Sequence, residues 1–437
     1  MKRGKSVRRN NSKPPDRHLN LRVRGLSQSA TLAINERSAA LEAEGRKVYR
    51  LGLGQSPFPV PRPVVDALKA NAHEKDYLAV RGLRKLREAV ADYHERAEGI
   101  RYDAADVMVG PGSKELMFVL QLVYYGDLVI PTPSWVSYAP QAQIIGRQIR
   151  WVPTDAVDHW RLTPSALDDI CQDDPDRPRI VILNYPANPT GDSYTSEELR
   201  ELADVARRYR VVMLSDEIYG PLHHRGQHVS ISRFYPEGTI ISSGLSKWCG
   251  AGGWRLGTFT FPETLRWLQD SMAVVASETY TSTSTPIQYA AIEAFRGGPE
   301  IEVHLVHSRR VLRALGLHIW RMMTEAGIKC TRPVGAFYLF PDFSPMSVRL
   351  AMRGIEGSRA LCEKLLDEVG VAMLPGADFG RPPEELTARL AYVNFDGGKA
   401  LRAATEIDRA QPLDEAFLNQ HCGDTVDAIA ALCDWAS

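Results

Sequence analysis

The chain has 437 residues, which is more than one hydrophobic core usually supports, so we expect two domains. Its 53 Lys and Arg side chains balance its 53 Asp and Glu side chains, and no apolar run reaches the roughly 18 residues of a membrane span, so we expect neither a nucleic-acid nor a membrane partner. The six cysteines are scattered without CxxC spacing and no signal-peptide core follows the first methionine, which predicts reduced thiols in the cytoplasm.

The first residues differ in composition from the rest of the chain. Residues 1 to about 20 are rich in Lys, Arg, Asn and Pro and contain few large apolar side chains. Such a segment buries too little apolar surface to order itself, so we expect residues 1–25 to form a disordered basic tail.

Two helices are marked by their apolar spacing and their ends. Apolar residues recur at three- and four-residue steps from Leu83 to Ala97 and stop before Gly99, which is typical of an amphipathic helix with a C-terminal glycine. Thr195 with Glu198 forms a capping box ahead of a second amphipathic pattern.

Five short apolar runs alternate with the helical patterns. They are continuously apolar and rich in β-branched residues, which is typical of strands in a buried, mostly parallel sheet. Because strands and helices alternate, we expect an α/β layer structure with helices on both faces of the sheet. The runs are 128–130, 180–183, 211–214, 240–241 and 258–261.

Polar residues follow three of these predicted strands directly. Asn184 and Asn188 follow one strand, Asp216 and Tyr219 follow the next, and residues 242–247 follow a third. Ligands of open α/β sheets bind beyond the carboxyl ends of the strands, so we expect the three groups to converge on one crevice.

The segment 244–257 is the most informative part of this crevice. Lys247 lies among small residues, and Arg255 follows eight residues later between glycines 253 and 257. An amine in this setting is suited to form a Schiff base beside a phosphate that the guanidinium grips, which is how pyridoxal phosphate is held. An ordinary basic turn is the alternative interpretation of this segment alone.

Three residues near the lysine suit the ring of the same cofactor. The carboxylate of Asp216 would pair with a protonated pyridine nitrogen, although a helix N-cap explains this residue equally well. Asn188, which opens a turn-forming Asn-Pro-Thr-Gly string, and Tyr219 would both hydrogen-bond the ring oxygen. The alternatives are a turn residue for Asn188 and a surface aromatic for Tyr219.

Gly112 and Ser113 lie where another helical pattern begins, ahead of residues 116–123. Glycines at a helix start expose backbone N–H groups to an anion, and the helix dipole favours the negative charge. The sequence contains no Gly-x-x-x-x-Gly-Lys-Ser/Thr string, and no Gly-x-Gly-x-x-Gly follows a predicted strand, so the common nucleotide-binding motifs are excluded.

Two further residues suit contacts with a ligand. Trp135, after the strand at 128–130, would lie flat on the cofactor ring, with a buried core tryptophan as the alternative. Arg389 enters a short apolar strand pattern and would grip a substrate carboxylate with two N–H bonds, whereas an internal salt bridge explains it equally well.

Together and in this order, the motifs make the chain resemble the class I/II aminotransferases, pyridoxal-phosphate enzymes of fold type I in the aspartate aminotransferase superfamily. The resemblance runs from about Ser29 to about Val393. Besides the segment 244–257, it is carried by Tyr77 with Gly82, Gly112-Ser113-Lys114, Pro133-Ser134-Trp135, Asn188 to Gly191, Asp216 to Tyr219, Pro333 to Tyr338, Pro375 to Phe379, and Arg389.

The resemblance implies a fold and an assembly. The large domain would hold a mostly parallel sheet of the seven-stranded type flanked by helices, and a smaller α+β domain would accompany it. Residues 71–305 would form the large, pyridoxal-phosphate-binding domain, and residues 26–70 and 306–437 the small one. The tyrosine that matches Tyr77 reaches the phosphate of the neighbouring subunit, which implies a homodimer with shared sites.

The resemblance also implies roles for the motif residues. Lys247 would hold pyridoxal 5′-phosphate covalently and would act with Asp216 and Tyr219 in catalysis. The lysine that matches Lys114 reads a distal carboxylate in some aspartate- and prephenate-type members. Cofactor contacts would come from Gly112, Ser113, Lys114, Trp135, Asn188, Asp216, Tyr219, Ser246, Lys247, Arg255 and Tyr77, and substrate contacts from Gly54, Trp135, Asn188, Arg389 and Lys114.

The expected reaction is transamination between an L-amino acid and a 2-oxo acid, with a dicarboxylic substrate of the aspartate or glutamate type. Lys247 would take the Cα proton and return it. β-Elimination and decarboxylation on the same fold stay open as alternatives, because the same lysine and aspartate serve those reactions.

Two departures from the family pattern affect these expectations. Gly54 opens the string Gly-Gln-Ser-Pro-Phe in place of the commoner Gly-Glu-Pro-Asp-Phe, which leaves the pocket for the substrate side chain undefined. Gly244 stands where many members place a phosphate-binding serine, which leaves Ser243 or Ser246 to compensate.

Two segments have no assigned role in this interpretation. Residues 397–424 look like an insertion before a last helix at 426–435. His223, His224 and His228 lie in a polar loop with no further ligand pattern, so we expect no metal.

Overall fold

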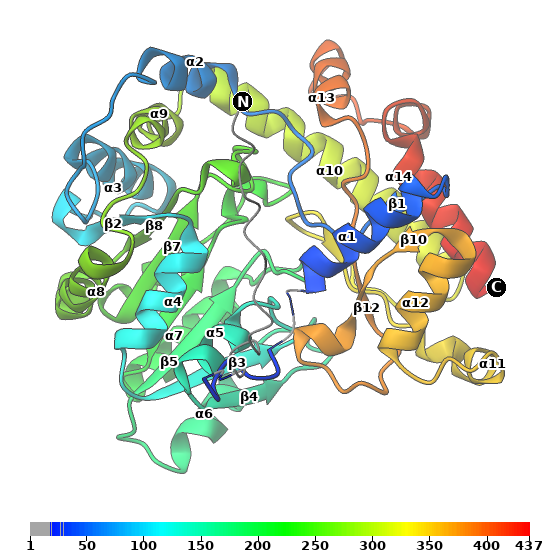
Figure 1. Cartoon of the computed structure of the whole chain (residues 1–437), viewed down its shortest axis with the longest axis horizontal. Coiled ribbons are helices and arrows are strands. Elements are labelled where there is room, and N and C mark those ends of the chain that lie inside the picture. Colours follow the sequence, from blue (N-terminus) through cyan, green and yellow to red (C-terminus); the bar gives the residue numbers. More distant parts are fainter. Residues whose placement is uncertain (1–17, 19, 27, 29) are drawn as a thin grey trace, which may run out of the picture.

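The computed structural model describes residues 18, 20–26, 28 and 30–437. Its largest sheet has seven strands in the order β2-β8-β7-β6-β5-β3-β4 (Figure 1). β8 is antiparallel to β2 and β7, and the other neighbouring pairs are parallel. The strands are β2 (Val107–Gly110), β3 (Asp127–Thr132), β4 (Ile149–Pro153), β5 (Arg179–Asn184), β6 (Val212–Asp216), β7 (Thr239–Gly244) and β8 (Gly257–Thr260).

Helices cover both faces of this sheet, because the strands present apolar side chains on both sides. The covering helices include α4 (Ser113–Val123), α5 (Tyr138–Ile145), α6 (Pro164–Gln172), α7 (Ser196–Arg208) and α8 (Arg266–Thr279). Leu214 of β6 packs in a cluster with side chains of α4, α5 and α8. Its neighbour Met213 packs in a separate cluster with side chains of α6 and α7.

Three helices flank the β2 edge of the sheet. α3 (Arg84–Glu98) and α2 (Arg62–Ala70) both pack against α9 (Thr285–Arg296). The long helix α10 (Pro299–Glu325) then leads from this part of the molecule to the smaller one (Figure 1).

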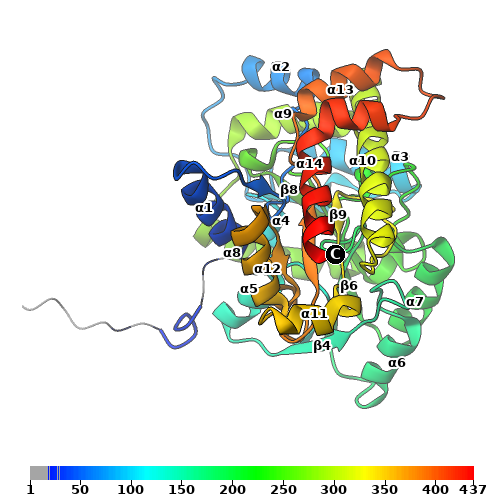
Figure 2. The same ribbon diagram turned by 90° about the vertical axis from the view of Figure 1, so that its right-hand side faces the viewer.

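The smaller part combines short strands with helices. An antiparallel sheet has the order β11-β12-β9, and β1 pairs in parallel with β10. Figure 2 shows α13 and α14 lying alongside α10, against which both pack. The elements are α1 (Ala30–Ala43), β1 (Tyr49–Arg50), β9 (Tyr338–Leu339), α11 (Ser347–Met352), α12 (Ser358–Val369), β10 (Val371–Ala372), β11 (Leu374–Pro375), β12 (Ala388–Ala391), α13 (Gly397–Glu406) and α14 (Glu415–Ala436).

The predicted elements of the large sheet are confirmed. All five predicted strands are present, as β3, β5, β6, β7 and β8. The helix predicted over 83–97 is α3, and Gly99 ends it in the left-handed conformation with φ 70°. Both halves of the capping box at Thr195 and Glu198 are formed at the start of α7.

The last helix begins earlier than predicted. α14 starts at Glu415 rather than at 426, and the Asp414 side chain caps it by accepting a hydrogen bond from the Phe417 N–H. A kink at Cys422, with φ −129° and ψ 19°, interrupts the helix and shifts the period of its apolar residues. The apolar pattern of the sequence therefore predicted only the second half of the helix. The segment 397–424 therefore consists of α13, a loop and the start of α14.

The domain boundaries stay a prediction. Residues 1–17 and 19 of the predicted tail lie outside the described residues, and within its described part Arg22 donates a hydrogen bond of 2.9 Å to the carbonyl of Ile145. Among the residues that the structure describes, no helix is both long and apolar enough to cross a membrane.

Candidate active site

The predicted crevice lies at the carboxyl edge of the large sheet, facing the small sheet. β5, β6 and β7 are parallel neighbours, so Asn184, Asp216 and Gly244 end side by side. Arg389 on β12 reaches this edge from the small sheet and donates a hydrogen bond of 3.1 Å to Oδ1 of Asn188. Residues distant in sequence therefore form one site.

Lys247 lies in the loop after β7 and points into this site. Its Nζ donates a hydrogen bond of 2.8 Å to the carbonyl of Gly54 and lies 5.5 Å from the centre of the Tyr219 ring. Burial, aided by the positive charge of Arg389, lowers the pKa of Lys247 to about 8 even though Asp216 opposes the shift. A sizeable fraction of the amine is therefore unprotonated, and nucleophilic, close to neutral pH.

Asp216 at the end of β6 is buried and held by hydroxyl groups. The Tyr138 hydroxyl donates to Oδ2 at 2.6 Å, and the Ser242 hydroxyl donates to Oδ1 at 3.2 Å. Burial raises the pKa of Asp216 to about 6 despite these hydrogen bonds. The N-cap alternative is wrong, because the helical turn that follows β6 spans Gly220–Leu222 and has Tyr219, not Asp216, at its N-cap position.

Tyr138 was missed in the sequence, although it is the closest partner of Asp216. It lies at the first position of α5, three residues after Trp135, and its ring meets the Trp135 ring edge-on at 5.2 Å. Nothing in the local pattern links it to a carboxylate 78 residues away along the chain.

An anion cradle is built where α4 and β8 meet. Gly112 precedes α4 with φ 93°, and no side chain caps the helix, so its first N–H groups remain available. Arg255 also has a left-handed backbone, with φ 56°, and its guanidinium lies so close to Gly112 that a Cβ there would clash with it. A Cβ on Gly257 would likewise clash with the N–H of Ser113.

Steric crowding explains why position 244 is a glycine rather than the serine found in many family members. A Cβ at this position would lie 2.8 Å from the carbonyl oxygen of Leu256, so a serine would require the two strands to separate. Ser246, the predicted substitute, is half-buried next to Lys247, and its hydroxyl donates to no other described residue.

Arg389 is a buried cation without an anion. It is 1% exposed, its Nη2 donates to the carbonyl of Gly52, and it stacks over the Tyr338 ring at 4.9 Å. None of the described carboxylates forms an ion pair with it, so the internal salt bridge weighed from the sequence is absent. Burying an unpaired guanidinium is costly, which favours a carboxylate ligand as the missing partner.

Two tyrosines complete the wall beside Lys247. The hydroxyls of Tyr219 and Tyr338 are 2.7 Å apart, and a Cβ on Gly54 would clash with the Tyr338 hydroxyl. Tyr219 is only 2% exposed, so the surface-aromatic alternative is wrong. Asn188 does lie in a turn, as its alternative had it, but it is 5% exposed and its side chain accepts a hydrogen bond from Arg389. From the sequence, Tyr338 has no predicted role. This residue appears there only as the end of the motif Pro333 to Tyr338.

Trp135 and Lys114 lie at the mouth of the site. Lys114 Nζ is 5.1 Å from the centre of the Trp135 ring, and Trp135 is half-buried. Lys114 also borders a cavity of about 870 Å³ that reaches α1 and α12. Tyr77, by contrast, is 88% exposed and makes no described hydrogen bond to the other predicted site residues.

The three histidines do not face a common point. Nε2 of His228 is 2.9 Å from Oε2 of Glu217, whereas Nε2 of His224 is 3.2 Å from the carbonyl of Ala336. Glu98, Glu217 and His228 do bring three ligand-type atoms within 4.8 Å of one another. The carboxylates there already accept from Ser230 and Arg233, although Nδ1 of His228 has no hydrogen-bond partner among the described residues.

Comparison with known proteins identifies the family. Residues 46–396 match the family model described as aminotransferase class I and II. An aspartate aminotransferase of Geobacillus stearothermophilus is 36% identical over 380 residues, covering 85% of this chain and 93% of the relative. An aspartate/prephenate aminotransferase of Cereibacter sphaeroides is 32% identical over 382 residues, covering 84% and 92%.

A solved structure shares the fold over nearly its whole length. The structure of aspartate aminotransferase from Thermus thermophilus with maleate superposes with a TM-score of 0.80 at 27% sequence identity. The match covers 96% of this chain and 100% of that one, which confirms the predicted fold class.

Proposed function

This chain belongs to the aminotransferase class I and II family, and on that premise we propose that Lys247 binds pyridoxal 5′-phosphate covalently. The family transfers amino groups with this cofactor attached to a lysine. The observation that carries the assignment is the pairing, in one crevice, of a buried amine of lowered pKa, Lys247, with a buried carboxylate, Asp216.

The donor set of the crevice fits the cofactor group by group. Arg255, the backbone at Gly112, the first N–H group of α4 at Ser113 and the Ser246 hydroxyl would hold the phosphate. Asn188 and Tyr219 would bind the ring oxygen, and Trp135 would stack on the ring. Tyr77 would reach the phosphate of a neighbouring subunit.

The chemistry divides between the cofactor and the chain. When bound, pyridoxal phosphate supplies an electron sink for the negative charge that develops on the substrate Cα. Asp216 would hold a proton on the ring nitrogen as its ion-pair partner. The amine of Lys247 would take the Cα proton and return it, which suits a base with a pKa of about 8.

The proposed substrate is a dicarboxylic amino acid and its 2-oxo acid. Arg389, buried and without an ionic partner, would grip the α-carboxylate together with the Gly54 backbone. Lys114 at the mouth would meet the distal carboxylate. Relatives named aspartate and aspartate/prephenate aminotransferase, and a maleate complex among the structural neighbours, support this choice.

We further propose a cytoplasmic homodimer with shared sites. Tyr77 is 88% exposed, and Trp267 and Val274 are 55% and 67% exposed on one face of α8, as expected of surfaces that a second subunit covers. All six cysteines are described and none is in a disulfide, which supports a reducing compartment.

The lysine assignment is tested by borohydride reduction of the holoenzyme followed by peptide mapping. We expect the cofactor to be fixed on the peptide that contains Lys247. The Lys247→Ala variant should bind the cofactor without covalent fixation and should lose turnover by several orders of magnitude. Lys85→Ala, at an exposed helix position, is the matched control and should retain activity; near-normal turnover of the Lys247→Ala variant would sink the assignment.

The reaction type and the substrate class are tested by single-turnover mixing of the holoenzyme with amino acids. Accumulation of pyridoxamine phosphate supports transamination, whereas free ammonia with pyruvate indicates β-elimination. Lys114→Ala should lower kcat/KM for aspartate by about tenfold or more, the loss of one charge-assisted hydrogen bond, and should change kcat/KM for alanine little. An equal loss for both substrates would contradict the role of Lys114.

A further inference from the structure

A second polar cavity lies outside the proposed active site. Its volume is about 290 Å³, and three segments enclose it: the loop 223–227, the helix α10, and residues 332–334. The loop follows Tyr219 in the chain, and residues 332–334 precede Tyr338, so both segments lead directly to the active-site wall. Its polar and charged lining residues are His223, His224, Arg225, Gln227, Arg313 and Arg332.

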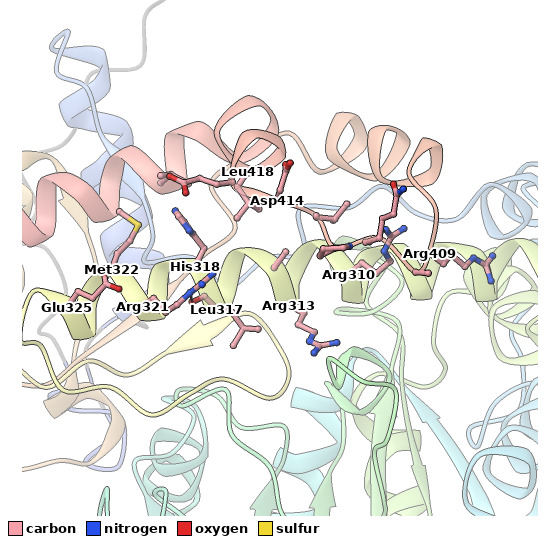
Figure 3. A pocket seen from close by; sticks show the side chains of 17 residues that line it. Arg310, Arg313, Leu317, His318, Arg321, Met322, Glu325, Arg409, Asp414 and Leu418 are labelled. Carbon is pink, nitrogen blue, oxygen red and sulfur yellow. Dashed lines mark hydrogen bonds between the residues drawn. The ribbon is translucent and has the colours of Figure 1, made fainter.

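The charge of this lining is positive only. Arg225, Arg313 and Arg332 border the cavity, and no aspartate or glutamate does. Within the described part of the chain, none of the three guanidinium groups forms an ion pair or a hydrogen bond. Arg313 also borders the neighbouring groove that contains Asp414 and Glu415 (Figure 3), but it forms no ion pair with either carboxylate.

The histidines of the loop add donors to the same cavity. Nδ1 of His223 accepts hydrogen bonds from the N–H groups of Arg225 and Gln227, at 3.3 and 3.2 Å, which leaves Nε2 as the donor of that ring. Burial, together with the positive charges of His228 and Arg309, lowers the pKa of His223 to about 4. His223 is therefore neutral close to pH 7, and the positive charge at the cavity comes from the exposed side chains of Arg225, Arg313 and Arg332.

One buried polar atom beside the cavity also lacks a partner. His224 is 6% exposed, its Nε2 is occupied by the carbonyl of Ala336, and its Nδ1 has no hydrogen-bond partner among the described residues. Buried polar atoms are nearly always satisfied, so an unpaired one next to a cationic cavity indicates a bound ligand or water.

We propose that this cavity is a binding site for a phosphate group, either inorganic phosphate or the phosphoryl group of a small metabolite. Three guanidinium groups and the Nε2–H of His223 supply donors for the oxygens, and a protonated phosphate oxygen supplies the hydrogen that Nδ1 of His224 lacks. The site is separate from the phosphate cradle at Arg255 and does not depend on the proposed role of Lys247.

Occupancy would tie three segments together. His224 N–H already donates to the carbonyl of Val334 at 2.8 Å, and His223 and Gly335 form an isolated β-bridge. A bound phosphate would add contacts from Arg313 on α10 to this junction. Tyr219 precedes the loop 223–227, Tyr338 follows residues 332–334, and their hydroxyls are 2.7 Å apart, so we expect binding to stabilise the wall beside Lys247.

The test is calorimetric titration of the holoenzyme, whose own phosphate cradle is already filled, with sodium phosphate against sodium chloride of equal ionic strength. We expect one saturable phosphate site per chain and a rise in Tm that chloride does not produce. Arg313→Gln and Arg332→Gln should each weaken binding by about tenfold, since each removes a charge-assisted hydrogen bond.

Arg321→Gln is the matched control. Like Arg313, Arg321 is an exposed arginine of α10 that borders the groove between α10 and residues 409–418 (Figure 3). Only Arg313 of the two also borders the proposed phosphate cavity, so phosphate affinity should not change in the Arg321 variant. A parallel titration with glycerol phosphate separates the two sources: tighter binding than inorganic phosphate indicates a phosphorylated metabolite, and weaker binding indicates the free ion. Absence of saturable binding, or equal affinity in wild type and the Arg313→Gln/Arg332→Gln double variant, would overturn the proposal.

Discussion

Asp216 illustrates how burial of ionisable residues in the crevice lowers the stability of the folded protein. The carboxyl group is fully enclosed, and even two hydroxyl donors do not compensate for its lost hydration, because burial raises its pKa from 3.8 to about 6. Lys247 is shifted in the opposite direction for the same reason. The charged form of each group is poorly hydrated, and a ligand group of opposite charge would stabilise it. Such shifted pKa values are typical of active sites.

The pKa of Asp216 predicts a pH dependence of stability in the cofactor-free protein. Between pH 3.8 and about 6 Asp216 is protonated to a greater extent in the folded protein than in the unfolded chain, so its contribution to the free energy of unfolding falls as the pH rises through this window. Relative to the wild type, Asp216→Asn should remove that contribution and make the cofactor-free protein more stable at pH 8 by about 1–3 kcal/mol. Urea unfolding at pH 4 and pH 8 measures both effects.

The control for this experiment is a variant at a solvent-exposed aspartate of the same protein. Asp155→Asn alters an exposed carboxylate and should leave the pH dependence as in the wild type. A cofactor-free Asp216→Asn protein that is less stable than the wild type at pH 8 would show that the buried carboxylate contributes favourable interactions that outweigh its desolvation.

At the scale of elements, the phosphate cradle depends on close approach of a strand to a helix start. β8 passes the first turn of α4 at Gly257, where any side chain would collide with the Ser113 N–H. Glycine at this position is therefore a packing requirement, since a Cβ would push the strand away from the N–H groups that face the anion.

Gly257→Ala should damage both stability and cofactor binding. Overpacking of this kind costs about 1–3 kcal/mol, and the displaced helix start should weaken pyridoxal phosphate binding by about tenfold or more. Thermal unfolding and equilibrium dialysis of the cofactor provide the two readouts. Gly253→Ala is the control, because nothing lies within 4 Å of a Cβ built there, and equal behaviour of the two variants would exclude the steric explanation.

The same scale shows where sequence patterns succeed and fail. The capping box at Thr195 and the glycine stop at Gly99 were predictable because both signals lie within one helical turn of the feature they define. The start of α14 was not predictable from apolar period, because the kink at Cys422 breaks that period within the helix.

At the scale of the whole molecule, the site joins segments from both ends of the chain. Lys247 bonds to Gly54, 193 residues earlier, and Arg389 bonds to Gly52, 337 residues earlier. The proposed dimer extends this principle to a second chain, since Tyr77 is exposed in its own subunit.

Subunit mixing tests the shared site. Lys247→Ala and Tyr77→Phe proteins should each show reduced activity as homodimers, but a mixed dimer should contain one intact site, with Lys247 from the Tyr77→Phe chain and Tyr77 from the Lys247→Ala chain. Refolding the two proteins together should therefore give more activity than their average. No gain in a preparation shown by sedimentation to be dimeric would place Tyr77 in the site of its own chain.

The sequence by itself determined five of the seven strands of the large sheet, the polar residues that follow three of them, and the family, because apolar runs, residue order and motif spacing are properties of the chain. Convergence of Asn188, Asp216 and Lys247 followed from the parallel order of β5, β6 and β7. Only the tertiary structure showed that Tyr138 donates to Asp216, that Tyr338 meets Tyr219, and that Arg389 lacks an ionic partner. Those facts depend on packing between residues far apart in the chain, and burial, which sets the pKa values of the site, exists only after the chain has folded.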